Sequence, residues 1–232
     1  GLGEAYWGPG LRPVIDRVLK EQLLGDNPLD VDRLYTKMTH NLGGLHNEAG
    51  AVVAAMSGIE IALWDLAGKL TGLPVYRLLG GKFRDRVRMY RTAHPEDGLS
   101  LESCKEFAAK MRNEGWTAIK SIDVDDMWRK YDPELREVGH EPLSRSLTLT
   151  DLKRAERFMD NLRQAFGDTY DIIVHCHWKL DLHPALQLAR RVAPYNPMWI
   201  EDPLPPYFSP AWVHLTQASP VPISTGENLY GK

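Results

Sequence analysis

The sequence predicts an α/β protein in which a helical segment precedes a parallel β/α barrel. Three short apolar runs are each followed by a polar motif. Each motif contains a residue that could act as a ligand, and these three residues are evenly spaced along the sequence. His175 is followed after 26 positions by Glu201, which is followed after another 26 by Glu227. That interval accommodates one strand, one helix and two short loops, the repeating unit of parallel α/β folds. Side chains at the ends of such strands converge at one rim, where imidazole and carboxylate groups are candidate metal ligands.

The first part of the chain is expected to be helical. Gly1 to Gly10 is rich in glycine and is predicted to be a loop. Apolar residues recurring at helical spacing predict helices over residues 13–23, 31–38 and, most clearly, 48–70. Gly72 and Pro74 end the last helix. We assign residues 1–81, which close with Gly80-Gly81, to a first domain.

From residue 82 onward the pattern predicts strands that alternate with helices. The expected strands are Val87–Thr92, the segment ending at Lys120, and the apolar runs that lead into His175, Glu201 and, after Pro222–Thr225, Gly226. The expected helices are Leu101–Asn113, Leu149–Phe166, Pro184–Val192 and Pro210–Ala218. The polar stretch Asp123–Ser146 is predicted to be a long loop of the kind that covers a site.

The number of strands is smaller than a closed barrel requires. An eight-stranded β/α barrel takes about 250 residues, whereas 151 residues follow Gly81. Either the chain is a piece of a longer protein or its parallel sheet is open. We favour the first, and expect residues 82–232 to be the first five β/α units of a barrel whose remainder is absent from this chain.

Composition narrows the class of protein. The net charge of −3 and the pI near 6.3 give no basic footprint for nucleic acid. We find no apolar run near the length of about 20 residues that spans a bilayer, and no signal peptide. Two cysteines, Cys104 and Cys176, are too few for a disulfide framework. These observations predict a cytoplasmic protein without nucleic-acid or membrane partners.

Several motifs resemble one known family. Ser57 to Lys69 (SGIEIALWDLAGK), followed by GLPVY at 72–76 and LGG at 79–81, resembles the signature helix of the mandelate racemase and muconate lactonizing branch of the enolase superfamily. The patterns IEDPL at 200–204 and TGE at 225–227 resemble its strand-end ligands. The likeness covers residues from about 40 to the end of the chain. It implies an α+β capping domain over residues 1–81, with its first strands missing, a (β/α)8 barrel, and a homo-oligomer.

The resemblance also implies a chemistry. In that family a small-molecule carboxylate binds Mg²⁺ and a base removes the proton next to the carboxylate. The carbon acid is weak, so the enediolate must be stabilised as it forms, and a hard divalent cation supplies the charge. Several members then expel a β-hydroxyl and so dehydrate acid sugars.

The implied metal ligands match this chain in part. Glu201 and Glu227 match the second and third ligands of the family, and His175 stands where the family has a carboxylate. Imidazole suits Zn²⁺ or Ni²⁺ better than Mg²⁺, so another divalent metal remains open. Asp202 follows Glu201 directly and is expected to face the opposite side of the strand.

The implied catalytic residues are Lys120 and His177. Lys120 matches the first lysine of the family's second-strand Lys-x-Lys motif, but the second lysine is replaced by Ile122. His177 lies two residues beyond His175, where the acid-sugar dehydratases carry the general acid for the leaving hydroxyl. Residues two apart on a strand share a face, and a His with a pKa near 6.5 suits proton donation. The base is expected beyond residue 232.

Three further residues are predicted to bind substrate. His94 follows the first expected strand and is placed at the rim of the barrel. Tyr6 and Trp7 are placed in a capping loop that closes over the ligand.

The sequence thus predicts a Mg²⁺-dependent sugar-acid dehydratase, a hydro-lyase. Two alternatives stay open. One is a racemase or cycloisomerase with the same enediolate chemistry, against which the missing lysine at Ile122 argues mildly. The other is a catalytically degenerate scaffold, which the His175 replacement favours.

Overall fold

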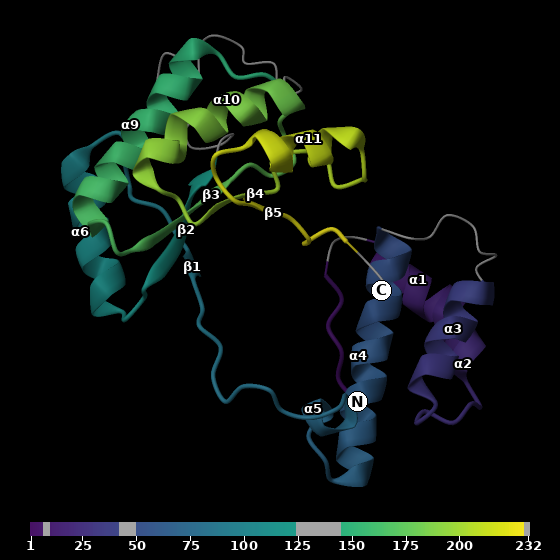
Figure 1. Cartoon of the computed structure of the whole chain (residues 1–232). Helices are drawn as coiled ribbons and strands as arrows, with labels where there is room; N and C mark the ends of the chain where they lie inside the picture. The colour runs from purple at the N-terminus through teal and green to yellow at the C-terminus, as the bar shows by residue number, and fades with distance from the viewer. Residues whose placement is uncertain (7–9, 42–49, 124–144, 230–232) are drawn as a thin grey trace. The chain divides into compact units, whose positions relative to one another are not determined.

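The chain divides into two compact units. The computed structural model describes residues 1–6, 10–41, 50–123 and 145–229. The first unit comprises Gly1–Val87 with the last residues of the chain, and the second comprises Arg88–Glu227 (Figure 1). The predicted loop over Asp123–Ser146 falls almost wholly on residues 124–144, which lie outside the described residues.

The first unit is built from helices, as the apolar spacing predicts. Their bounds are α1 Leu11–Val14, a π-helical segment η1 Ile15–Leu19, α2 Lys20–Leu23, α3 Val31–Asn41, α4 Ala51–Thr71 and α5 Val75–Leu78. The first predicted helix therefore begins earlier, at Leu11, and passes through one π-helical turn. A small core joins Leu19, Met38, Val53 and Met56.

Helix α4 is the longest element in the described part of the chain. It ends at Gly72, whose φ of 70° is easy only for glycine and whose N–H donates to the Gly68 carbonyl. Among the described residues it is the one helix long and apolar enough to cross a membrane by length and composition, contrary to the expectation from the sequence. Core helices of soluble proteins pass the same test, and Val53 to Met56 of this helix are buried.

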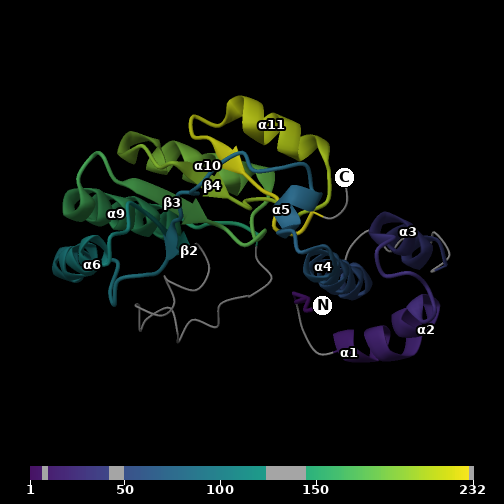
Figure 2. The same ribbon diagram turned by 90° about the horizontal axis from the view of Figure 1, so that it is seen from below.

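The second unit is a parallel sheet covered by helices. The strands are β1 Arg91–Thr92, β2 Ala118–Asp123, β3 Asp171–His175, β4 Trp199–Glu201 and β5 Ile223–Ser224. They pair in sequence order and every pair is parallel. The helices are α6 Leu101–Asn113, α9 Leu149–Phe166, α10 Leu182–Val192, the short 3₁₀ segment η2 Ala193–Tyr195, and α11 Pro210–Ala218. They lie along one face of the sheet (Figures 1 and 2), and this confirms the α/β class.

One predicted strand is largely wrong. Of the segment Val87–Thr92 only the last two residues pair with β2. The Arg88 side chain instead donates to Asp171 Oδ2 at 2.6 Å and to the Thr117 carbonyl at 2.9 Å. Val87 and Met89 are exposed, so no buried face holds this segment in strand register.

The core of the second unit lies between the sheet and its helices. Strand residues Ile119, Ile172, Val174 and Ile200 are at most 1% exposed and form one cluster with residues of α6, α9 and α10. Near-continuous apolar strands are expected where a parallel sheet is covered. This packing fixes the strand ends, where the polar residues begin.

Candidate metal centre

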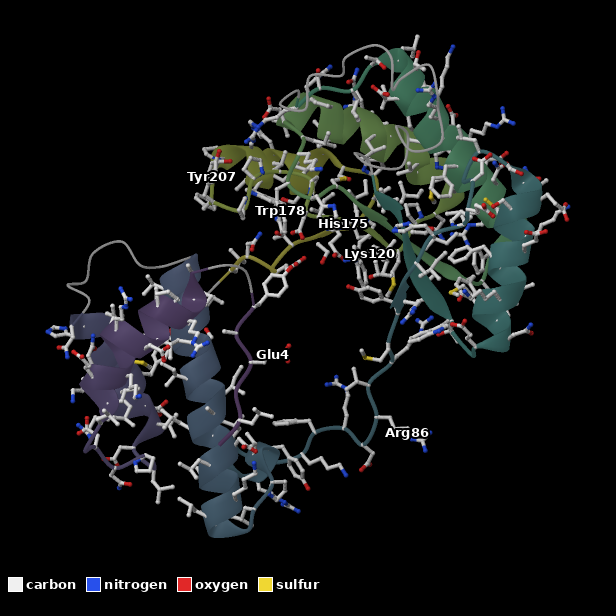
Figure 3. The ribbon with its side chains drawn as sticks, turned by 180° about the vertical axis from the view of Figure 1, so that it is seen from behind. Glu4, Arg86, Lys120, His175, Trp178 and Tyr207 are labelled. Carbon is white, nitrogen blue, oxygen red and sulfur yellow. The ribbon has the colours of Figure 1, made fainter. Side chains whose placement is uncertain are left out.

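The register of the sheet brings the predicted strand-end residues together. His175 ends β3 and pairs with Glu201 at the end of β4, and Glu201 pairs with Ser224 at the end of β5. One ligand atom from each of His175, Glu201, Asp202 and Glu227 lies within 4.8 Å of the others. Figure 3 shows Lys120, His175 and Trp178 at this end of the sheet. The residues that are evenly spaced in the sequence therefore lie close together in the structure.

The His175 side chain is buried, and one nitrogen of its ring has no hydrogen-bond partner within the described part of the chain. The residue is 5% exposed. Its Nε2 lies 3.9 Å from Glu201 Oε1 and 3.8 Å from Asp202 Oδ2. Both distances exceed hydrogen-bond length, and Nε2 has no hydrogen-bond partner among the described residues.

Both carboxylate oxygens of Glu201 accept a hydrogen bond. Lys120 Nζ donates to Oε1 at 2.6 Å, and Trp199 Nε1 donates to Oε2 at 3.0 Å. Burial by itself would lower the pKa of Lys120, but the hydrogen bond and charge of Glu201, with smaller contributions from Tyr90 and Glu227, outweigh it and the pKa is raised. Lys120 is therefore an ammonium at neutral pH.

Asp202 does not face away from the site, so the expectation from strand alternation is wrong. The residue follows β4 and has a left-handed φ of 49°, which breaks the two-residue alternation of a strand. Its carboxylate lies inside the cluster and is 1% exposed. Thr225 Oγ1 donates to Oδ1 at 2.7 Å. Sequence reasoning missed this residue because no local signal predicts the turn, and Pro203 even argues against it.

Two loops at the site are tied together by their backbones. Trp178 N–H donates to the Asp202 carbonyl at 2.6 Å, Cys176 N–H to Glu201 at 2.9 Å, and Leu180 N–H to Pro203 at 3.0 Å. His177 and Trp178 have φ values of 48° and 58°. Such conformations are costly for residues with a Cβ and tend to cluster at functional sites.

The predicted general acid lies beside the predicted ligand. The ring centroids of His175 and His177 are 3.7 Å apart. Strand alternation, the expected cause of this proximity, does not apply here. Strand β3 ends at His175, and His177 lies in a left-handed turn after it.

A cavity of about 460 Å³ adjoins the cluster. It is lined by residues including Tyr90, Lys120, Trp199, Asp202 and Glu227. The ammonium of Lys120 and the carboxylates therefore line the same cavity, which a small acid could enter.

The remaining predicted binding residues lie elsewhere or are not described. His94 Nδ1 is hydrogen-bonded with the Ser121 carbonyl, and His94 lines a second cavity of about 330 Å³ with Glu106 and Lys110 of α6. Tyr6 is an exposed residue of the first unit. Trp7 lies outside the described residues. Substrate contact by these three residues stays a prediction.

The donor set fits a divalent metal ion. Two metal–ligand bonds of about 2.1 Å each join atoms up to about 4.2 Å apart. The Nε2–Oδ2 and Nε2–Oε1 distances of 3.8 and 3.9 Å fall within that limit. A buried imidazole nitrogen and a buried carboxylate oxygen, neither with a hydrogen-bond partner among the described residues, are the atoms that a cation would satisfy.

Comparison with known proteins gives consistent matches along the whole chain. Residues 1–80 match the family described as "Mandelate racemase / muconate lactonizing enzyme, N-terminal domain", and residues 103–232 match "Enolase C-terminal domain-like". A D-xylonate dehydratase of Haloferax volcanii is 39% identical over all of this chain and 54% of its own length. An L-talarate/galactarate dehydratase of Salmonella typhimurium is 30% identical over 91% of this chain and 46% of its own length.

Comparison with solved structures leads to the same family. A mandelate racemase/muconate lactonizing enzyme-like protein from Rubrobacter xylanophilus has a TM-score of 0.86 and 36% identity, over 99% of this chain and 60% of that one. The chain spans about half the length of the curated relatives it matches.

Proposed function

Because the chain belongs to the mandelate racemase / muconate lactonizing enzyme family of the enolase superfamily, we propose that this protein is a metal-dependent hydro-lyase that dehydrates a sugar acid. The observation that carries the proposal is one cluster of His175, Glu201 and Glu227 with Lys120 and His177 beside it. The names of the relatives, a D-xylonate and an L-talarate/galactarate dehydratase, support it.

In this proposal His175, Glu201 and Glu227 hold the metal, for which the family resemblance implies Mg²⁺. When bound, the cation supplies positive charge that stabilises the charge developing on the substrate carboxylate. Residues 1–81 are proposed as the capping domain and 82–232 as the first five units of a β/α barrel. A cytoplasmic location and a homo-oligomer belong to the same proposal.

Lys120 is proposed to bind the substrate carboxylate. Its side chain is 11% exposed and its ammonium lines the cavity. An ammonium carries several N–H donors, so the bond to Glu201 is compatible with a second acceptor. Fixed positive charge in a dry site stabilises developing negative charge without reorganisation.

His177 is proposed to protonate the leaving β-hydroxyl. An imidazole can both donate and accept a proton, which is what general acid catalysis requires. Its ring lies 3.7 Å from that of His175 between centroids, at an interplanar angle of 53°, which puts it beside the proposed metal site, where a bound hydroxy acid would present its hydroxyls.

The test is a screen of the purified full-length protein against a panel of sugar acids, with detection of 2-keto-3-deoxy products. We expect metal-dependent product from at least one acid. His177→Asn should lower the rate by about 10²-fold or more, the usual contribution of general acid catalysis. His214→Asn, at an exposed histidine of α11, is the matched control and should leave the rate unchanged. If metal-loaded wild type turns over no acid, the proposed function is wrong.

A further inference from the structure

Asp202 is a buried carboxylate, and the structure describes a hydrogen bond to only one of its two oxygens. The residue is 1% exposed, and its Oδ1 accepts a hydrogen bond from Thr225. Its Oδ2 has no hydrogen-bond partner among the described residues. Burying a charged oxygen without a partner is costly, so a cation is the expected neighbour of this atom.

A second candidate ligand atom close to Asp202 Oδ2 is the His175 nitrogen that has no hydrogen-bond partner among the described residues. Nε2 lies 3.8 Å from Asp202 Oδ2. That distance is too long for a hydrogen bond but within the span of about 4.2 Å that two ligands of one metal ion can cover. Both atoms belong to the cluster in which four ligand atoms lie within 4.8 Å of one another.

The local charges agree with a divalent ion. The cluster contains three carboxylates, from Glu201, Asp202 and Glu227, and one ammonium from Lys120. With a neutral imidazole, two negative charges remain, which is the charge that a divalent cation neutralises.

The backbone holds Asp202 in a costly conformation that keeps its carboxylate in the cluster. A left-handed φ of 49° before a proline is disfavoured. Two backbone hydrogen bonds maintain it, from Trp178 N–H to the Asp202 carbonyl at 2.6 Å and from Asp202 N–H to the Ser224 carbonyl at 2.9 Å.

We propose that Asp202 is a direct ligand of the metal and that it replaces the carboxylate lost where His175 ends β3. This inference rests on the metal site of the proposed function and adds a ligand that the family resemblance does not imply. The site thus holds three carboxylates and one imidazole, which gives it the negative charge of an all-carboxylate site together with one nitrogen donor.

The test measures metal binding without turnover. Mn²⁺ affinity is followed by electron paramagnetic resonance, and the ligand environment by the visible absorption of bound Co²⁺. Asp202→Asn keeps the size of the side chain and removes its charge. Because loss of an outer residue already costs 10- to 100-fold in affinity, loss of a direct ligand should weaken Mn²⁺ binding by about 100-fold or more and change the Co²⁺ spectrum.

Two further variants separate a ligand from a neighbour of the ligands. Thr225→Val removes the hydrogen bond to Oδ1 but keeps the carboxylate, and should weaken Mn²⁺ binding by about 10-fold with a similar Co²⁺ spectrum. His175→Asp, added to Asp202→Asn, returns the site to three carboxylates and should restore Mn²⁺ affinity to within about 10-fold of wild type. No restoration in the double variant would contradict the replacement of one carboxylate by the other.

The outcomes distinguish this inference from the proposed function. If wild type binds Mn²⁺ and Asp202→Asn binds it equally well with the same Co²⁺ spectrum, Asp202 is not a ligand and the proposed function stands. If wild type binds no divalent ion, both fail. Should Asp202→Asn not fold, Asp202→Glu keeps the charge but displaces the oxygens, and an unchanged Co²⁺ spectrum in that variant would overturn the inference.

Discussion

Lys120 and the proposed metal would share one carboxylate. The ammonium of Lys120 lies 2.6 Å from Glu201 Oε1, and that oxygen lies 3.9 Å from His175 Nε2. The lysine therefore neutralises part of the charge that attracts a cation, and in the proposed function it also binds the substrate carboxylate. Its removal should affect metal affinity and catalysis in opposite directions.

We expect Lys120→Met to tighten metal binding and to lower activity. Removing one positive charge leaves the cluster with one more net negative charge, so Mn²⁺ affinity should rise by about 10-fold, or about 1.4 kcal/mol. The value of kcat/KM should fall by about 10²-fold or more, because a fixed charge for the substrate carboxylate is lost. Calorimetry with Mn²⁺ and steady-state kinetics check the two effects.

Lys105→Met is the matched control, because it removes the same charge from an exposed position on α6. It should leave both quantities unchanged. Weaker metal binding in Lys120→Met would mean that the lysine orients Glu201 rather than competes with the metal.

For individual residues, the sequence predicts which residue types form the site better than it predicts where their side chains lie. The spacing of His175, Glu201 and Glu227 predicts their convergence, because strand ends in a parallel sheet share one edge. It cannot predict that Asp202 joins them, since that depends on a left-handed backbone held by loop-to-loop hydrogen bonds from residues more than 20 positions away. The same holds for His177, whose approach to His175 comes from a turn and not from strand alternation.

Among the elements, the amphipathic helices follow the sequence most closely. Leu101–Asn113, Leu149–Phe166 and Pro210–Ala218 have the predicted bounds. Helix α9 begins with a capping box between Thr148 and Asp151, a local signal that the chain carries in its own sequence. Strand β1 is shorter than predicted because strand length depends on a partner strand, and only Arg91 and Thr92 find one.

The loop before α6 packs tightly on α9 at Gly98. A Cβ added there would lie 2.6 to 2.8 Å from three ring atoms of Phe158, which is 1% exposed. The Gly98 carbonyl also accepts a hydrogen bond from Asn161 Nδ2 at 3.1 Å. Glycine is required at this contact for space.

Gly98→Ala should therefore destabilise the second unit by about 1–3 kcal/mol, the usual cost of overpacking a core. Denaturant unfolding followed by circular dichroism measures the loss. Phe158→Leu in the same chain removes the ring that clashes, so the two substitutions together should cost less than the sum of their separate effects. Strict additivity would show that the alanine methyl group is accommodated without contact with Phe158.

On the scale of the whole molecule, the structure divides at Val87 and places every residue of the proposed metal cluster in the second unit. Sequence patterns predict helices followed by alternating strands and helices, and the two units follow that order. How the units are arranged depends on contacts that no periodicity encodes, so the roles predicted for Tyr6 and Trp7 stay predictions.

Cys104 offers a way to observe how the metal cluster and the core of this unit are coupled. The residue is 0% exposed on α6, and burial raises the pKa of its thiol to about 12. The thiolate is the reactive form, so at pH 8 Cys104 should react with iodoacetamide only when the second unit opens. A ligand that binds only the folded state stabilises it by about 2.7 kcal/mol at 100 times its dissociation constant.

We therefore expect Mn²⁺ at that concentration to slow Cys104 alkylation by about 100-fold, provided that opening and closing are faster than labelling. Mass spectrometry of peptides follows Cys104 separately from Cys176, which is also buried but adjoins His175. Asp202→Asn should reduce the protection to about twofold or less at the same Mn²⁺ concentration, because a site with about 100-fold weaker affinity would be at most about half occupied. Protection of Cys176 without protection of Cys104 would show that the metal stabilises only the strand ends, and that α6 opens independently of the site.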